Sequence, residues 1–169
     1  DLFLYSRTPG TIWGADRQFI SCGRLDDLQC AYASLMGLLS ADVHSGIAVH
    51  CMLDNEEVGS STKQGAASSF LKDTLTRICI CLGKTQQDYY AMLASSFMLS
   101  ADVFKSICQI ADVPYQTFLN RSDMAGGSTL GNISNTQVAL NTVDIGLAQL
   151  SMHSPYETAG AKDTDYLIR

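Results

Sequence analysis

The amino-acid sequence predicts an α/β fold, in which a mostly parallel central sheet carries helices on both faces as a three-layer sandwich. Segments typical of buried strands alternate with segments of helical apolar spacing through most of the 169 residues. Hydrophobic residues make up 46% of the chain and charged residues 17%, which favours a well-buried sheet over a disordered chain. The length is that of one ordinary domain with a substantial core.

Two segments of the first half show these patterns most clearly. "GRLDDL" leads into residues 25–39, where acidic residues suit a helix N-terminus and apolar residues recur at helical spacing (Leu28, Tyr32, Leu35, Leu38 and Leu39). "GIAVHCML", residues 46–53, is a continuous apolar run rich in β-branched residues. This run predicts a strand that is covered on both faces.

The remaining elements continue the alternation. We expect a helix over residues 64–82, capped by Ser61 or Thr62, with one apolar face (Phe70, Leu71, Leu75 and Ile78). "FMLSAD" predicts a short buried strand, "FKSICQIAD" a helix that ends before Pro114, and "YQTFLN" another strand. A Gly-rich loop, "RSDMAGGSTLG", then precedes a helix-like stretch, "ISNTQVALNT".

Charge and cysteine content exclude several classes of protein. The net charge of −6 leaves no basic stripe for a phosphate backbone, so no nucleic-acid partner is expected, and an acidic pocket for cations fits better. Charged residues interrupt every apolar stretch before the ~20 residues of a membrane span, so no membrane partner is expected. The six cysteines form no CxxC motif. We therefore expect reduced thiols and a reducing, cytoplasmic compartment.

Acidic residues and one histidine recur where predicted strands end. They are Asp26, Asp27, Glu56, Glu57, Asp102 and His153. Each alone is more typical of a turn, a helix cap or a structural histidine. In a parallel α/β sheet, however, the carboxyl ends of the strands meet at one crevice. Carboxylates and an imidazole around a shared pocket suit a pair of divalent metals, with one carboxylate bridging them.

The adjacent glutamates of "LDNEEVGS" can have separate tasks. Consecutive residues that leave a strand point in different directions, so one can bind metal while its neighbour acts as a general base. The alternative is a solvated acidic turn. Other candidates have less support: His44 fits a solvated loop and His50 a structural position in an apolar run. "AGGSTLG" lacks the lysine of a phosphate-binding loop, and no GxSxG motif occurs.

Five segments together resemble the aspartyl aminopeptidase family of dinuclear zinc metallopeptidases. They are "RLDDL", "LDNEEVGSSTKQGA", "SSFMLSAD", "NRSDMAGGSTLG" and "DIGLAQLSMHSPYE", in this order over nearly the whole chain. The resemblance implies a zinc-peptidase-like fold with two zinc ions. It implies that Asp26 bridges the metals, that Glu57 and His153 hold one and Asp102 the other, and that Glu56 is the general base.

The same resemblance implies the activity and its partners. The family removes N-terminal residues, preferably Asp or Glu, from peptide substrates, and it forms large homo-oligomers. Its first histidine ligand and its dimerisation insert precede the segments found here, and neither appears before Asp1.

The resemblance also implies that a block on the order of forty residues is missing between Val103 and Phe104. In the family this block includes a basic residue implicated in choosing acidic substrates. We therefore expect residues 1–169 to be part of a catalytic domain. The alternative is an inactive fragment or pseudoenzyme that acts in assembly or binding.

Overall fold

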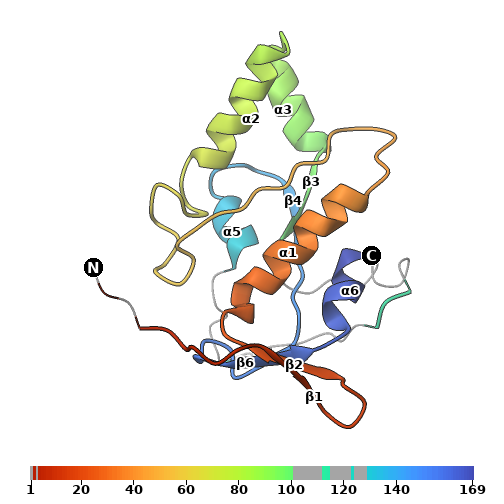
Figure 1. Cartoon of the computed structure of the whole chain (residues 1–169). Coiled ribbons are helices and arrows are strands. Elements are labelled where there is room, and N and C mark those ends of the chain that lie inside the picture. The colour runs from red at the N-terminus through yellow and green to blue at the C-terminus, as the bar shows by residue number, and fades with distance from the viewer. Residues whose placement is uncertain (1, 3, 101–111, 115–122, 124–128) are drawn as a thin grey trace. The chain divides into compact units, whose positions relative to one another are not determined.

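The computed structural model describes residues 2, 4–100, 112–114, 123 and 129–169. The chain divides into two compact units (Figure 1). The first unit comprises Asp1–His50, Ser106–Tyr115 and Gly146–Arg169, and the second comprises Cys51–Lys105 and Gln116–Ile145. Each unit is described by itself below.

A four-stranded antiparallel sheet forms the base of the first unit. Its strand order is β1 (Thr11–Trp13), β2 (Phe19–Cys22), β6 (Glu157–Gly160) and β5 (Gln149–Leu150). β2 pairs with β6 so that Phe19 lies opposite Gly160 and Cys22 opposite Glu157. This pairing joins two segments that are far apart in the sequence.

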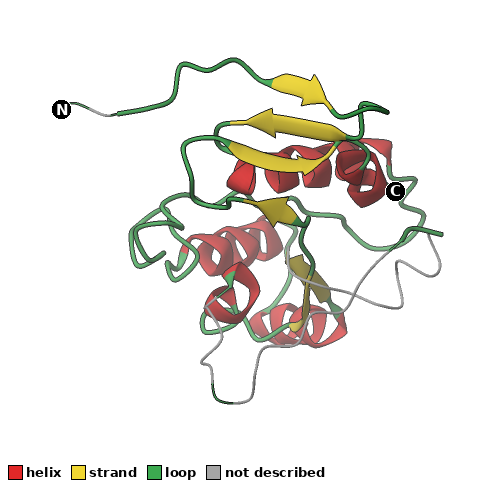
Figure 2. Ribbon diagram, turned by 90° about the horizontal axis from the view of Figure 1, so that it is seen from below, coloured by secondary structure: helices red, strands yellow, loops and turns green. Residues whose placement is uncertain are grey.

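Two helices pack against each other and against β6, on one face of this sheet (Figure 2). α1 spans Leu25–Ser40, as the apolar spacing predicts, and α6 spans Asp163–Ile168. The buried residues of α1 are small or polar, namely Gln29, Cys30 and Ala33. Gly37 lies beside the end of α6, and a Cβ added there would meet the carbonyl oxygen of Ile168 at 3.5 Å, an ordinary van der Waals contact.

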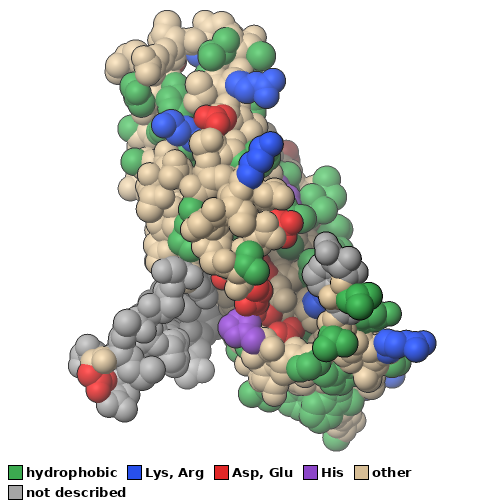
Figure 3. Space-filling view, turned by 90° about the vertical axis from the view of Figure 1, so that its left-hand side faces the viewer, with side chains coloured by type: hydrophobic (Ala, Val, Ile, Leu, Met, Phe, Trp, Pro, Cys, Tyr) green, Lys and Arg blue, Asp and Glu red, His purple; other side chains and the backbone are tan. Residues whose placement is uncertain are grey.

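Most of the large apolar side chains that give α1 its helical spacing are exposed. Leu28, Tyr32, Leu35 and Leu39 all reach the surface, and Leu39 is 70% exposed. Hydrophobic side chains are likewise visible on the face of the molecule drawn in Figure 3. The helix is therefore present as its apolar spacing predicts, but its small residues, and not these large ones, make its packing contacts.

The second unit combines a parallel strand pair with three helices. β3 (Phe97–Ser100) pairs in parallel with β4 (Asn141–Asp144), so a strand is present within "FMLSAD" as predicted. It is not the buried strand expected, since Phe97 and Leu99 are exposed. α5 (Leu130–Ser134) contacts both strands, and α2 (Phe70–Cys81) packs on α3 (Gln86–Ser95). Cys79, Tyr89 and Leu93 form the small core between α2 and α3.

The apolar run 46–53 forms no strand, contrary to prediction. Ile47, Val49 and Met52 are exposed, and Ile47 is 75% exposed. A strand requires a neighbour that supplies backbone hydrogen bonds, and none of the described strands pairs with these residues. The apolar run has the composition of a strand, but it has no neighbouring strand among those described with which to form one.

Two predicted helices also have different bounds. α2 begins at Phe70, because the hydroxyls expected to cap it earlier are engaged in the preceding loop. Asn55 donates its side-chain N–H to the Thr62 hydroxyl at 2.9 Å, and Ser61 donates its hydroxyl to the Gly59 carbonyl at 3.2 Å. The predicted helix over 133–142 ends at Ser134, and its last residues enter β4 instead.

The fold is α/β in composition, but its described sheets are only partly parallel. Parallel pairing is found between β3 and β4, whereas the larger sheet is antiparallel. The helix predicted at "FKSICQIA", the strand at "YQTFLN" and the junction of Val103 with Phe104 lie outside the described residues. None of the described helices is long and apolar enough to cross a membrane.

The close contact of Gly131 in α5 with β3 and β4, called the cradle here, provides a test of how the second unit packs. A Cβ at Gly131 would lie 2.8 Å from the Cβ of Ser100 and would also meet the Asp144 carboxylate. We expect Gly131→Ala to destabilise the fold by about 1–3 kcal/mol, as overpacking does. Urea unfolding measures this loss. The matched control is Gly37→Ala, which we expect to be neutral or to stabilise α1 by about 0.5–1 kcal/mol; equal effects of the two variants would contradict the cradle.

Candidate metal centre

Antiparallel pairing of β2 with β6 brings Asp26 and His153 to the same end of the sheet. Asp26 lies four residues after the end of β2 at Cys22, and His153 lies four residues before the start of β6 at Glu157. Because Cys22 lies opposite Glu157, the exit of one strand meets the entry of the other. The predicted convergence of these two residues is therefore achieved by antiparallel rather than parallel strands.

The two side chains approach closely enough to share a metal ion. The Asp26 Oδ2 atom lies 3.3 Å from the His153 Nε2 atom, with the side chains 21% and 63% exposed. Zinc takes carboxylate oxygen and imidazole nitrogen at about 2.0–2.2 Å, so two of its tetrahedral ligand atoms are about 3.4 Å apart. The donor types and their separation therefore fit zinc.

The carboxylate of Glu157 contacts the backbone of both residues, and the sequence analysis did not single it out. Its side chain is only 2% exposed. The Oε2 atom accepts a hydrogen bond from the backbone N–H of Asp26 at 3.0 Å, and the Oε1 atom accepts one from the backbone N–H of His153 at 2.9 Å. The signal was its place four residues after the histidine in "MHSPYE".

The backbone around both residues departs from regular structure. Asp26 and Asp27 have non-helical dihedral angles inside the first turn of α1. The Asp26 N–H lies in the first turn, where no helical carbonyl can accept it, and it donates to Glu157 instead. His153 has φ of 66°, in the left-handed region that non-glycine residues seldom adopt. The Ser154 hydroxyl closes the same loop by donating to the Tyr156 carbonyl at 2.8 Å.

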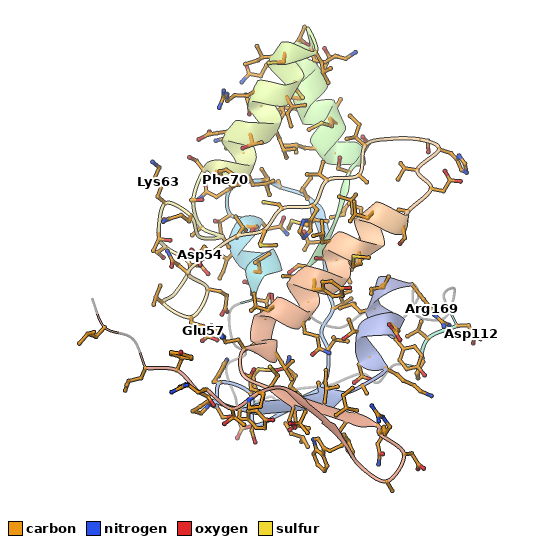
Figure 4. The ribbon with its side chains drawn as sticks, in the orientation of Figure 1. Asp54, Glu57, Lys63, Phe70, Asp112 and Arg169 are labelled. Carbon is orange, nitrogen blue, oxygen red and sulfur yellow. The ribbon has the colours of Figure 1, made fainter. Side chains whose placement is uncertain are left out.

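The two adjacent glutamates lie in a hydrogen-bonded turn of the second unit. The Gly59 N–H donates to the Glu56 carbonyl at 2.9 Å, and the Ser60 N–H donates to the Asn55 carbonyl at 3.0 Å. Both glutamate side chains are exposed, and Figure 4 shows Glu57 in the loop that precedes α2. Exposure suits a general base and also suits a solvated turn, so both interpretations of "NEE" stand.

The loop that carries these glutamates is internally braced. Ser60 is fully buried, and its carbonyl accepts a hydrogen bond from the Ala67 N–H at 3.2 Å. The Asp54 N–H donates to the Gln64 carbonyl at 3.0 Å. The turn is therefore held by its own loop and not by the strand predicted before it.

The other predicted residues have different positions. Asp102 lies outside the described residues, two positions beyond the end of β3 at Ser100. The approach of Glu56, Glu57 and Asp102 to Asp26 and His153 stays a prediction. His44 is exposed beside Asp42, at 3.3 Å, and His50 contacts the Ser34 hydroxyl at 3.0 Å.

One thiol lies close to the first unit's site. Burial raises the pKa of the Cys30 thiol to about 12, and the charge of Asp27 and a hydrogen bond to it raise the pKa further. Cys30 is therefore a protonated packing residue and does not supply a thiolate ligand at neutral pH.

Comparison with known proteins identifies the class of this protein. The model of the aminopeptidase I zinc metalloprotease (M18) family matches residues 1–106 and 103–169. The chain therefore belongs to the M18 family of zinc metalloproteases. This confirms the family expected from the sequence motifs.

Relatives and a solved structure extend the comparison. The chain is 39% identical to a probable M18 family aminopeptidase 2 of Clostridium novyi, over 98% of this chain and 48% of the relative. It is 31% identical to aspartyl aminopeptidase 4 of Saccharomyces cerevisiae, over 100% of this chain and 46% of the relative. The mApe1 dodecamer of S. cerevisiae matches with a TM-score of 0.72 and 25% identity, over 97% of this chain and 47% of that one. The chain thus spans about half the length of these proteins.

The raised pKa of Cys30 predicts selective labelling of the cysteines. Only the thiolate reacts with iodoacetamide, so the rate at Cys30 should stay low at pH 8 and rise about tenfold per pH unit toward pH 12. Exposed Cys81 serves as the internal control and should be alkylated first. Mass spectrometry of peptides from the folded chain measures both rates. Equal labelling of Cys30 and Cys81 at pH 8 would contradict the buried, protonated thiol.

Proposed function

We propose that the full-length protein is a metallo-aminopeptidase that removes N-terminal acidic residues from peptides through a dinuclear zinc site. The observation that carries the proposal is the 3.3 Å approach of Asp26 to His153 in a chain of the M18 family. Both side chains belong to the first unit, and both come from motifs that the family resemblance assigns to metal binding. Their donor atoms and spacing suit zinc.

The ligand set is proposed as follows. Asp26 would be shared by two zinc ions, Glu57 and His153 would hold one of them, and Asp102 would hold the other. When bound, zinc would supply Lewis-acid stabilisation of the peptide carbonyl and would acidify a water molecule. Asp26 and His153 then serve as ligands and take no proton themselves.

The proton transfers are assigned to Glu56. Its exposed carboxylate lies at the start of a hydrogen-bonded turn, where it can reach a substrate. It would take the proton of the attacking water and deliver it to the departing amine. The neighbouring Glu57 would remain ionised as a ligand, so adjacent residues of one type have different tasks.

The finer features are part of the proposal. A preference for N-terminal Asp or Glu is supported by the name of the aspartyl relative, and a homo-oligomer by the solved dodecamer. The predicted parallel three-layer sheet belongs to the full-length protein, and so does the cytoplasmic location. The missing block between residues 103 and 104 is supported by family matches that meet at residues 103–106, and by an alignment of 209 residues for this 169-residue chain.

Removal of metal tests the activity against the alternative of an inactive assembly protein. Chelation of the purified full-length protein should abolish hydrolysis of an Asp-peptide, and added zinc should restore it with about two ions bound per active site. Zinc analysis and peptide hydrolysis on the same samples measure this. A folded protein that binds less than one zinc and cleaves no peptide would favour the assembly role.

The two glutamates are distinguished by paired substitutions in the full-length protein. Glu56→Gln should lower turnover by roughly 10²–10⁴-fold while zinc stays bound, because only the base is removed. Glu57→Gln should weaken zinc binding, and excess zinc should restore part of its activity, because a charged ligand is lost. Zinc content and kcat are measured for each variant.

The pair contains its own control, since both substitutions are isosteric and lie in the same exposed turn. Metal loss in Glu56→Gln with retention in Glu57→Gln would reverse the two assignments. Unchanged activity and unchanged zinc content in both variants would show that "NEE" is a solvated turn.

A further inference from the structure

We propose that Glu157 is a positioning residue of the metal site, whose buried carboxylate holds the backbones of Asp26 and His153 in the separation that zinc requires. The inference rests on the proposed function, since it takes these two residues as ligands. It concerns the first unit alone, because all three residues belong to it.

The carboxylate of Glu157 joins two backbone segments through one hydrogen bond to each, an arrangement called the clamp below. One carboxylate oxygen accepts the Asp26 N–H at 3.0 Å and the other accepts the His153 N–H at 2.9 Å. The two N–H groups are 127 residues apart in the sequence but are joined through a single side chain. Movement of either backbone segment away from the other would break one of these hydrogen bonds.

Burial explains why a carboxylate suits this position. A carboxylate that is 2% exposed is costly unless its oxygens are hydrogen-bonded. Two donors satisfy both oxygens, and hydrogen bonds to a charged acceptor are stronger than those between neutral groups. A glutamine of the same shape has one acceptor and one –NH₂ donor, so it can satisfy only one of the two N–H groups.

Each ligand backbone also requires an external restraint. The N–H of Asp26, in the first turn of α1, has no acceptor within the helix, and His153 has a left-handed φ of 66°. Such a conformation persists in a non-glycine residue only where its surroundings enforce it. Glu157 supplies that restraint to both residues, so the side-chain separation of 3.3 Å depends on it.

The pairing of β2 with β6 fixes the position of the carboxylate itself. Glu157 lies opposite Cys22, and the next pair along the strands joins the Ser21 and Thr158 hydroxyls at 2.6 Å. Thr158 therefore provides a matched control on the same strand pair. Its substitution by valine removes a strand-to-strand hydrogen bond but leaves both contacts of the Glu157 carboxylate.

Zinc affinity of the full-length protein tests the proposal. Glu157→Gln should weaken zinc binding by roughly 10–100-fold, the usual effect of removing a partner that orients metal ligands. Thr158→Val should lower thermal stability but keep wild-type zinc affinity. Asp26→Asn, which removes a proposed ligand, should also weaken binding. Chelator competition measures affinity on samples whose folding circular dichroism confirms, and the zinc-induced rise in Tm gives a second readout.

The outcomes separate this inference from the proposed function. Wild-type affinity in Asp26→Asn would overturn the metal site itself and the clamp with it. Weakened binding in Asp26→Asn with wild-type affinity in Glu157→Gln would overturn the clamp alone, as would an equal loss of affinity in Thr158→Val. If Glu157→Gln does not fold, Glu157→Asp replaces it, because the shorter carboxylate reaches one N–H group; wild-type affinity in that variant would overturn the clamp.

Discussion

The pairing of β2 with β6 is the constraint on which the rest of the first unit depends. It joins segments separated by more than one hundred residues, so the entropy of closing that loop must be offset by local contacts. Those contacts include the Ser21–Thr158 hydroxyl pair and the Trp13 indole N–H, which donates to the Ser21 hydroxyl at 2.7 Å. Because the pairing is antiparallel, it also sets the end of the sheet at which Asp26 and His153 meet.

The sequence placed Asp26 and His153 in one candidate site but did not predict the antiparallel sheet that brings them together. The approach of Asp26 and His153 was expected from parallel strand ends, whereas the structure obtains it from antiparallel ones. The two strands responsible are each four residues long, and "ETAG" has almost no apolar signal. A strand this short can be identified only from the strand with which it pairs, because its own residues show no clear pattern. A single sequence does not reveal a pairing between residues 19–22 and 157–160.

The apolar periodicity of the sequence predicted the presence of some helices and strands, but it did not predict which side chains are buried. The helix at 25–40 and the strand at 97–100 were expected and are present. The run 46–53 and the large apolar face of α1 have equally clear patterns, yet most of their larger side chains are exposed. Apolar periodicity indicates which side chains favour burial, but burial also requires a partner surface. Among the described residues, no strand pairs with residues 46–53.

Burial distinguishes glutamates that look alike in the sequence. Glu56 and Glu57 lie exposed in a turn, where a carboxylate can meet a substrate or an ion. Glu157 is buried, and each of its oxygens already accepts a backbone N–H. Breaking those bonds to bind a metal would leave two donors unsatisfied in the interior, which is costly. A glutamate carboxylate therefore suits proton transfer or metal binding in the exposed turn, and it suits the positioning of ligands at the start of β6. The hydrogen-bond partners of its oxygens determine which of these roles it can have.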